Sequence, residues 1–325
     1  NIFKTENTYF ENSSKFTPHV KTMSFAILGW YIATFVLCTI AYVIGGLDFF
    51  TAINAAAGTV STGGMMPTDA SMNGLSPFVH YSACFFMFIS ACPLTAFIAC
   101  IIGDYRKLFG DEQIRTYFFL VLIVSLVVAA TLYLKNEYEL ERAFRIALFN
   151  VISVSSSTGF ALEDFTLWNP VATVIFMLIL PIGACAGSTS GGLKIFRINV
   201  LLSLFRVQCI KSIHPHRVIQ PQFNGNPVDA ATVQSIVTFF SSYLIVAVIS
   251  SFLAIIMGLG ASDAFSATIT CLSNVGPPMG DQLTPSGNFA GLGSGLHLLF
   301  AFDMLLGRLE IIPVLLCCTR MFWRA

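Results

Sequence analysis

The sequence predicts an all-α polytopic membrane protein, and three observations support this prediction. First, 55% of the 325 residues are hydrophobic and only 10% are charged, whereas roughly 25% of the residues in an ordinary soluble domain are charged. Second, several apolar segments exceed the roughly 18 residues that indicate a bilayer span. Third, the order long helix, short helix, polar elbow, long helix occurs three times. The formal net charge is zero, so nothing suggests nucleic-acid binding.

The long apolar runs lie at residues 23–46, 77–102, 116–134, 168–204, 231–258 and 291–319. A shorter segment lies between the first and second runs, another between the third and fourth, and a third between the fifth and sixth. These segments read DFFTAINAAAGTVSTGG, ERAFRIALFNVISVSSSTGF and SDAFSATITCLSNVGPP. Each has about 11–13 weakly apolar residues, too few to cross a hydrocarbon core of roughly 30 Å but suited to a re-entrant hairpin. The chain therefore reads as three copies of one unit.

Each short segment ends in an elbow of polar residues and glycine. One alignment of the three segments brings Gly63, Gly159 and Gly276 to equivalent positions within one residue. Non-helical backbone at membrane depth must be buried in protein or line a wet cavity. If the units pack around one axis, the elbows converge there, and their carbonyl and hydroxyl oxygens replace the water shell of a cation. Glycine is needed because consecutive carbonyls point inward only with unusual dihedral angles.

The elbows are thus predicted to form a selectivity filter. The short helices would point their negative C-terminal ends at its axis, which favours a cation there. A single elbow could equally be a helix-capping turn at a packed interface, but the threefold occurrence favours the filter. The expected ion-binding residues are Ser61, Thr62, Gly63, Ser157, Thr158, Gly159, Asn274, Val275 and Gly276.

Several motifs resemble those of a known family. TVSTGG (59–64), SSSTGF (155–160) and SNVGPP (273–278) look like filters of the Trk/Ktr/HKT superfamily of cation transporters. GACAGSTSGGLKIFRI (183–198) resembles the broken helix in the third repeat of that family. MLLGRLE (304–310), followed by MFWR, resembles the C-terminal end of bacterial Trk potassium-uptake membrane subunits. The resemblance runs over nearly the whole chain.

The resemblance implies a fold and its division. Members of the family fold as four helix–pore-helix–filter–helix units around a central pore, and this chain has three of them. Residues 1–21 are then a cytoplasmic linker after a missing first repeat. The second repeat covers residues 22–112, the third 113–217 and the fourth 218–325.

The resemblance also implies an activity and partners. The implied activity is uptake of K⁺ across the cytoplasmic (inner) membrane, by a homodimer with one pore per protomer. A cytoplasmic ring of nucleotide-binding regulatory subunits is implied as well. No nucleotide motif is found in this chain, so any nucleotide is expected on that ring. K⁺ is the transported ion, and neither a cofactor nor a transition metal is expected in the chain.

GACAGSTSGG interrupts what would otherwise be one long apolar helix. It is not a phosphate-binding loop, because that motif needs Gly-Lys-Ser/Thr after a strand, whereas Lys194 lies between Leu193 and Ile195. The resemblance implies an intramembrane loop below the filter that blocks the permeation path, and the alternative is a kink for close helix packing. The expected gating residues are Gly183, Gly187, Ser188, Thr189, Ser190, Gly191 and Gly192.

Arg308 lies well inside the last apolar run. An intramembrane charge is by default a hypothesis of function, and we expect Arg308 to limit how many ions occupy the path. Asp303 and Glu310 are candidate partners, and Gly307 is expected to let a neighbouring backbone approach. The alternative is a structural ion pair that locks two helices.

The distribution of lysine and arginine predicts the orientation. The elbows and the loops directly after them carry no basic residue, and thirteen of the 17 lysines and arginines lie on the opposite side. Because cytoplasmic loops carry an excess of these residues, the filter loops are expected to face outward and the basic loops to face the cytoplasm.

The sequence leaves other functions open. The sequence does not separate a K⁺ transporter from a Na⁺-permeable or Na⁺/H⁺-coupled relative, or from a non-conducting relative that lacks one repeat. An intramembrane serine hydrolase would need a serine and a histidine at one depth, yet only His297 lies inside an apolar run. None of the nine cysteines forms a CxxC pair, so a zinc or thioredoxin-like site is unsupported.

Overall fold

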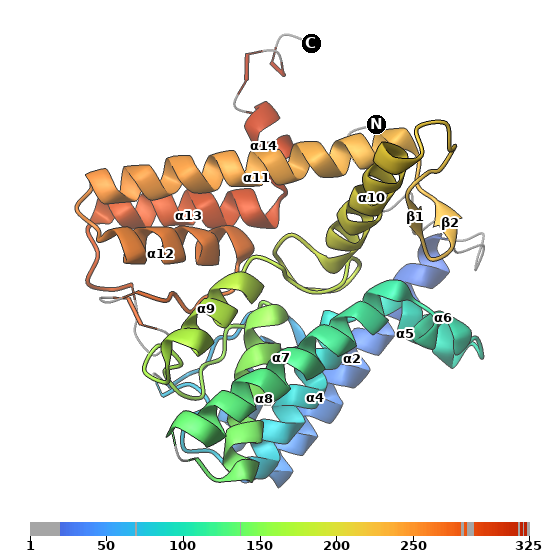
Figure 1. Ribbon diagram of the computed structural model, residues 1–325. Helices are drawn as coiled ribbons and strands as arrows, with labels where there is room; N and C mark the ends of the chain where they lie inside the picture. The colour runs from blue at the N-terminus through green and yellow to red at the C-terminus, as the bar shows by residue number, and fades with distance from the viewer. Residues whose placement is uncertain are drawn as a thin grey trace.

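A computed structural model confirms the predicted all-α fold (Figure 1). It describes residues 20–323 except 69, 137, 281–282, 285–288, 318 and 321. Apart from its last two residues, the predicted linker 1–21 lies outside the described residues, as do Met321 and Arg324 of the C-terminal motif.

The second repeat begins with α2 (Val20–Ile44) and the short helix α3 (Phe49–Val60). The Asp48 carboxylate caps α3 by accepting a hydrogen bond from the backbone N–H of Thr51 at 3.1 Å. Hydrogen bonds from the side chain and backbone of Thr51 lower the pKa of Asp48, so this end of α3 keeps a negative charge that suits its dipole. The repeat continues with α4 (Pro77–Ala91), α5 (Leu94–Ile101) and α6 (Arg106–Phe109).

The third repeat has the same order of elements. A long helix, α7 (Glu112–Asn136), is followed by the short helix α8 (Leu140–Ser155). Its second long run consists of α9 (Pro170–Ile179) and α10 (Ile195–Ile213), separated by a loop. Asn169 caps α9 by accepting a hydrogen bond from the N–H of Ala172 at 2.9 Å, and Pro170 suits the first helical position because its missing N–H would have no helical partner there.

A two-stranded antiparallel hairpin, β1 (Gln222–Phe223) and β2 (Asn226–Pro227), leads into the fourth repeat. That repeat contains a long helix and the third short helix, followed by two helices of the last apolar run. Their bounds are α11 (Ala230–Ile256), α12 (Ala261–Ser273), α13 (Ser294–Arg308) and α14 (Ile311–Cys317).

The second apolar run of every repeat is broken, whereas the sequence predicted a break in the third repeat alone. In the second repeat, α4 and α5 meet at an angle of 94°, because Pro93 removes a helical hydrogen bond and its ring clashes with the preceding turn. In the fourth repeat, Glu310 has a φ of 66° and separates α13 from α14. Pro313 explains this break, because its ring would clash with the carbonyl four residues earlier, at Leu309, if one helix continued through both residues.

Within the part of the chain that the structure describes, three helices are long and apolar enough to cross a membrane, namely Met23–Ile44, Glu112–Lys135 and Ala230–Ile256. The bent pair α4 and α5 makes a fourth span if it is taken as one. Large apolar side chains such as Phe25 on α2 and Phe252 on α11 are exposed, as expected for surfaces in contact with lipid.

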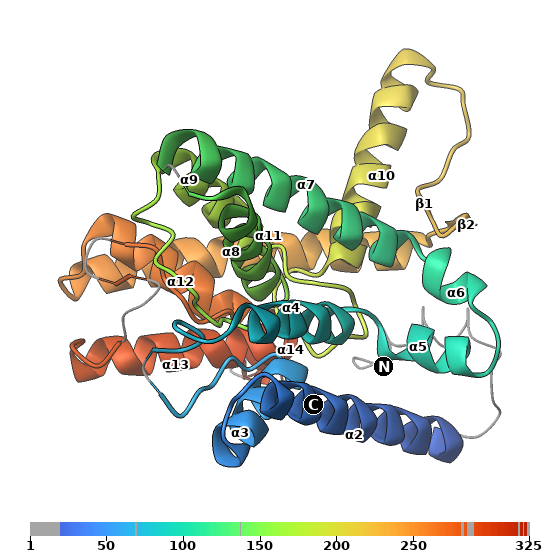
Figure 2. The same cartoon turned by 90° about the horizontal axis from the view of Figure 1, so that it is seen from below.

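The repeats surround the loop between α9 and α10. The second and third repeats share one apolar core, and the fourth repeat has its own core between α11, α12 and α13. In Figure 1 the fourth repeat, in orange, lies on one side and the earlier repeats, in blue to green, on the other, with that loop between them. Figure 2 shows α10 projecting away from the rest of the bundle.

Candidate functional site

The three short helices end in the same backbone geometry. Just beyond each helix, one N–H donates to the carbonyl five residues earlier, in the pairs Gly63–Gly58 (2.9 Å), Thr158–Ser153 (3.0 Å) and Val275–Thr270 (3.1 Å). The residue before each donor has a left-handed backbone, with φ of 51° at Thr62, 55° at Ser157 and 53° at Asn274. This is the Schellman ending of a helix. We call the segments that follow the second, third and fourth elbows (residues 61–65, 156–160 and 273–277).

The shared geometry fixes which glycines correspond. The residue after each donor again has a positive φ, of 62° at Gly64, 83° at Gly159 and 112° at Gly276. Gly64, and not Gly63, is therefore the counterpart of Gly159 and Gly276. The sequence assigned Gly63 to this position because two glycines are adjacent. The N–H groups of both glycines donate to the Gly58 carbonyl, at 2.9 and 3.2 Å, and the positive φ of Gly64 is what separates them.

The elbows lie side by side with their backbones in contact. A methyl group on Gly64 would lie 1.8 Å from the carbonyl oxygen of Thr158, and one on Gly159 would lie 1.9 Å from the carbonyl oxygen of Val275. Each glycine thus accommodates a carbonyl of the next elbow. The order around the centre is second, third, fourth.

The arc of elbows is open on one side. At Gly276 the nearest atom to an added methyl group is the Cα of Gly159 at 3.8 Å, so within the described residues no carbonyl of a further elbow packs there. Gly63 and Gly276 are exposed, whereas Thr158 of the middle elbow is buried. The open side therefore lies between the fourth and second elbows.

Hydroxyl groups on two short helices hold the elbows from behind. The Ser153 hydroxyl donates to the carbonyl of Phe160 at 2.6 Å, and the Thr270 hydroxyl donates to that of Pro277 at 3.2 Å. These pairs are equivalent in the third and fourth repeats. The second repeat has Gly58 at this position, and a methyl group there would lie only 2.8 Å from the carbonyl oxygen of Met65. The elbow therefore packs directly on α3.

A tyrosine of each long helix also binds the C-terminal end of the next short helix. Their hydroxyl pairs are Tyr42 with Thr59 (2.7 Å), Tyr117 with Ser155 (3.2 Å) and Tyr243 with Ser273 (2.9 Å). All six residues are buried. These bonds fix the depth at which each elbow begins.

The short helices favour a cation at the centre of the elbows. None of them has a basic residue in its last turn, and acidic residues lie at their other ends, namely Asp48, Glu141 and Asp263. The C-terminal ends therefore keep their partial negative charge toward the elbows. Carbonyl and hydroxyl oxygens suit a hard cation, and the described residues contain no group of three histidine, cysteine or acidic residues that could hold a metal.

The predicted gating residues lie in a closed loop and not in a kinked helix. Its base is paired by backbone hydrogen bonds of 2.9 Å, from Leu193 to Pro181, Lys194 to Ile182 and Ile195 to Ala184. The two limbs touch, since a methyl group on Gly192 would lie 2.8 Å from the Cα of Gly183. Both glycines have positive φ, of 80° and 69°, which a larger residue adopts only with strain.

The tip of the loop is bound to the elbows and to α4. The N–H of Gly191 donates to the Ser157 hydroxyl at 2.7 Å. The Thr189 hydroxyl is 3.3 Å from the carbonyl oxygens of Val60 and Ser90, and the Thr62 hydroxyl is 3.3 Å from it. The loop therefore lies where α3 and α8 end, directly against the second and third elbows.

Other loop residues contact each other or the break between α4 and α5. The hydroxyls of Ser188 and Ser190 form a hydrogen bond of 2.7 Å. The carbonyl of Gly187 accepts a hydrogen bond from the N–H of Leu94 at 3.1 Å. The loop, which belongs to the third repeat, is thus also bound to the second repeat.

Arg308 is the last residue of α13, and its Nη1 donates to the carbonyl of Thr189 at 3.2 Å. The two predicted partners are engaged elsewhere: Asp303 accepts from Ser250 at 2.7 Å, and Glu310 pairs with Arg197 at 2.9 Å. Arg308 is exposed, so it reaches the loop from a helix end and not from a packed helix interior.

Gly307 allows this placement of α13. A methyl group there would lie 1.9 Å from the carbonyl oxygen of Leu272. The backbones of α13 and α12 are therefore in contact, as the sequence predicted for Gly307. Arg308, the fourth elbow and the loop consequently lie in one neighbourhood.

Sequence reasoning missed several residues of this neighbourhood. Ser153 and Thr270 hold the elbows, the Ser90 carbonyl binds the loop, and the buried Gln113 accepts a hydrogen bond from the N–H of Ala186 at 2.8 Å. The sequence signal that could have identified Gln113 is a polar amide side chain just before a long apolar run. A backbone carbonyl such as that of Ser90 leaves no trace in the sequence.

The structure also opposes a serine hydrolase. His80 on α4 binds the Met72 carbonyl at 3.0 Å and Arg145 at 2.8 Å, and His297 on α13 binds the Phe289 carbonyl at 2.9 Å. Both helical histidines are thus engaged with groups other than a serine hydroxyl.

Comparisons with known proteins agree on one family. The family model TrkH, described as a cation transport protein, matches residues 4–324. The Trk system potassium uptake protein TrkI of Halomonas elongata is 33% identical over 326 residues, which cover 99% of this chain and 65% of that protein. TrkH of Vibrio parahaemolyticus is 30% identical over 317 residues, 96% of this chain and 65% of that protein.

A solved structure has the same fold. The crystal structure of the potassium transporter TrkH from Vibrio parahaemolyticus matches with a TM-score of 0.88 and 29% identity, over 94% of this chain and 66% of that one. The chain spans just under two thirds of the length of these relatives.

The backbone contacts predict different effects for two adjacent glycines. Gly64→Ala should lower the melting temperature of the detergent-solubilised protein, because a side chain in the left-handed region costs on the order of 1–3 kcal/mol and its methyl group would overlap the Thr158 carbonyl. Gly63→Ala is the matched control, because φ is not positive there and the nearest atom is a mobile Ser61 hydroxyl at 3.1 Å. Equal melting temperatures for the two variants would contradict this assignment of the glycines.

Proposed function

The chain belongs to the TrkH family of cation transport proteins, and on this basis we propose that it takes up potassium through a pore lined by its three elbows. The observation that carries the proposal is the packing of Gly64 and Gly159 against a carbonyl of the next elbow. This packing supports an arrangement in which the backbone oxygens of the three elbows surround one axis. The names of the similar proteins, which are potassium uptake proteins or transporters, favour K⁺ as the ion.

The proposed ion sites are formed by the carbonyl and hydroxyl oxygens of the elbow residues predicted from the sequence, with Gly64 added. Carbonyl oxygens can replace the hydration shell of K⁺. In this proposal the Schellman endings turn the chain away from each short helix, and the Ser153 and Thr270 hydroxyls hold the carbonyls that follow Gly159 and Gly276. In this proposal the short helices add negative potential from three directions.

A fourth segment is needed to close the arc. We place an elbow of the same kind at the open side, against Gly276 and Gly63. The relatives, of which the chain spans just under two thirds, are long enough to include another unit. A non-conducting relative would need no such segment.

The loop at residues 183–192 is proposed to be the gate. Its support is position, because Thr189 and Gly191 bind the ends of the second and third elbows. An ion leaving the elbows on this side would meet the loop at once. Opening then means breaking the hydroxyl bonds of about 3.3 Å at Thr189 and the bond from Gly191 to Ser157, while the paired base stays closed.

Arg308 is proposed to limit ion occupancy next to the gate. Two unit charges about 4 Å apart interact by about 4 kcal/mol at an effective dielectric constant of 20. Its bond to the Thr189 carbonyl also couples its position to that of the loop, so Arg308 can respond when the loop moves.

The remaining parts of the proposal concern orientation and partners. The basic residues Arg106, Lys107, Arg206 and Lys211 lie on α6 and α10, whose far ends lie on one side of the molecule with the hairpin (Figure 1). By the positive-inside rule this side faces the cytoplasm of an inner membrane and the elbows face outward. We place a nucleotide-binding regulatory subunit on the cytoplasmic side and a second copy of the protein beside the pore.

A potassium-uptake-deficient bacterium tests the function. The wild-type protein should restore growth on low K⁺ and accelerate Rb⁺ uptake. Ser153→Ala should make this uptake more sensitive to Na⁺ by roughly fivefold, since a lost hydrogen bond of about 1 kcal/mol has that effect on a ratio of rates. Ser153→Thr is the control, because Thr270 makes the same bond in the fourth repeat.

Two outcomes separate the function from the role of Ser153. Failure of the expressed, membrane-inserted wild-type protein to restore growth would overturn potassium uptake itself. Rescue by the wild type together with unchanged Na⁺ sensitivity in Ser153→Ala would leave the function standing and remove Ser153 as a determinant of selectivity.

Shortening the loop tests the gate. Deletion of residues 188–190 removes the Thr189 bonds but retains the paired base of the loop, so Rb⁺ flux into proteoliposomes should rise and depend less on the regulatory subunit. Thr189→Ala should cause a smaller rise in the same direction, and Thr189→Ser should resemble the wild type. If the flux per folded molecule does not rise in the deletion variant, the loop is not a barrier.

Arg308→Gln tests the proposed limit on occupancy. The variant keeps a hydrogen-bond donor for the Thr189 carbonyl but removes the charge, so it should insert at normal levels and show an altered maximal rate or K⁺ affinity. Rb⁺ uptake kinetics and thermal stability are measured together. A fall in stability with wild-type transport per folded molecule would make Arg308 a structural clasp only.

A further inference from the structure

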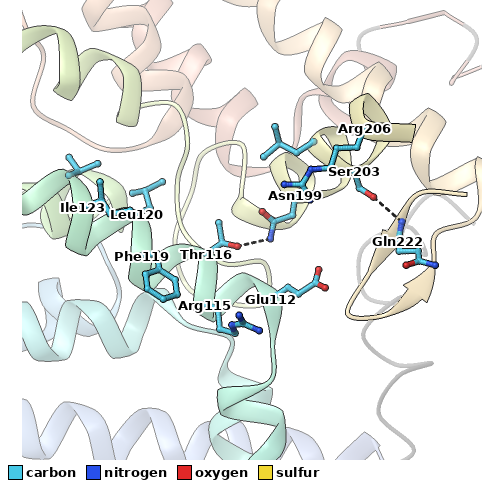
Figure 3. Close-up of a pocket in the computed structure, with 12 residues that line it drawn as sticks. Glu112, Arg115, Thr116, Phe119, Leu120, Ile123, Asn199, Ser203, Arg206 and Gln222 are labelled. Carbon is cyan, nitrogen blue, oxygen red and sulfur yellow. Dashed lines mark hydrogen bonds between the residues drawn. The ribbon is translucent and has the colours of Figure 1, made fainter. Parts of the chain in front are cut away.

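A cavity of about 830 Å³ lies between α7, α10 and the start of the hairpin (Figure 3). Its volume is near the upper end of the range for ligand pockets, roughly 300–1,000 Å³. It lies away from the elbows, and it exists because α10 projects from the bundle, as Figure 2 shows. The proposed pore leaves this space without a role.

Hydrogen bonds hold the walls of the cavity in place. The Asn199 amide on α10 donates to the Thr116 hydroxyl on α7 at 3.2 Å. The N–H of Gln222 at the hairpin donates to the Ser203 hydroxyl on α10 at 3.0 Å. Figure 3 shows both bonds across the cavity walls. The cavity is therefore a feature of the fold, bounded on three sides by bonded elements.

One end of the cavity is basic and polar. Arg115 on α7 and Arg206 on α10 both line it and are exposed, and Glu112 lines it as well. These three charged groups leave one net positive charge, which favours an anion over a neutral or zwitterionic group. An arginine guanidinium also suits a phosphate because it donates two parallel hydrogen bonds to it.

The other part of the cavity is apolar and extends along α7. Phe119 and Ile123 line it, and each is about half exposed. From Glu112 to Ile123 the axis of α7 rises about 16 Å. Because the apolar run of α7 begins at Thr116, the cavity passes from the polar boundary of the predicted membrane into its hydrocarbon core.

We propose that this cavity binds one anionic phospholipid, with its phosphate at Arg115 and Arg206 and an acyl chain along Phe119 and Ile123. The complementarity of charge at one end and of apolar surface at the other matches the two halves of such a lipid. A free phosphate would use only the basic end. A zwitterionic lipid would gain less from the net positive charge.

Lipid retained by the purified protein tests the proposal. Lipids that copurify in mild detergent are quantified by mass spectrometry, and phosphatidylglycerol and phosphatidylethanolamine are then titrated separately in native mass spectra. The wild type should retain phosphatidylglycerol in preference to phosphatidylethanolamine. The double variant Arg115→Gln/Arg206→Gln should lose at least fivefold in retention. The matched control, Arg106→Gln/Arg217→Gln, removes the same charge outside the cavity lining and should retain the lipid.

A second variant separates lipid from free phosphate. Ile123→Ser removes apolar surface and leaves the basic end intact, so it should weaken phosphatidylglycerol binding. A site that binds only free inorganic phosphate would be unaffected by this variant. Equal binding of the two lipids, equal losses in the two double variants, or displacement by inorganic phosphate would each overturn the proposal. So would a change of oligomeric state in Arg115→Gln/Arg206→Gln, measured by light scattering, because it would show that a second copy covers the cavity.

Discussion

The contact between an elbow glycine and a carbonyl of the neighbouring elbow is the constraint on which the rest of the structure depends. At Gly64 and Gly159 an added methyl group would lie within 2 Å of a carbonyl oxygen of the next repeat. Three separate helical units can therefore meet at one axis only if their elbows have no side chain at this position and a positive φ. The helix endings, the tyrosine bonds and the paired loop all serve to bring the backbones to this separation.

Buried polar groups are costly in a membrane protein unless they are paired, and the elbows concentrate many of them. Several of these groups have a hydrogen-bond partner in the structure: Ser153 has the Phe160 carbonyl, Tyr117 has Ser155, and Ser157 has the N–H of Gly191. Because the last of these partners belongs to the loop, the loop completes the hydrogen bonding of the third elbow. Displacing the loop leaves the Ser157 hydroxyl in need of another partner, such as water or an ion.

The helical fold was predictable because apolar length and low charge leave few alternatives, and the repeats were predictable because hydroxyl residues and glycine recur at one spacing. The register at Gly63 and Gly64 was not predictable, since adjacent glycines are equivalent in the sequence until their backbone dihedral angles separate them. The roles of buried hydroxyls were hidden for a similar reason. Thr59 binds the carbonyl of Ala55 in its own helix, whereas Thr270, also on a short helix, binds that of Pro277 in an elbow.

The turn of the chain directly after Arg308 ties the fourth repeat both to the loop and to the helix that follows it. Helix α13 ends at Arg308, and Glu310, with its positive φ, turns the chain so that its carboxylate pairs with Arg197 on α10. Arg308 thus bonds to the loop from one side, and Glu310, two residues further along the chain, holds the helix that follows the loop. A displacement of α10 relative to α13 must then strain either the Arg197–Glu310 pair or the bond from Arg308 to Thr189. The position of α10, and of whatever fills the space between it and α7, is therefore mechanically linked to the loop beneath the elbows.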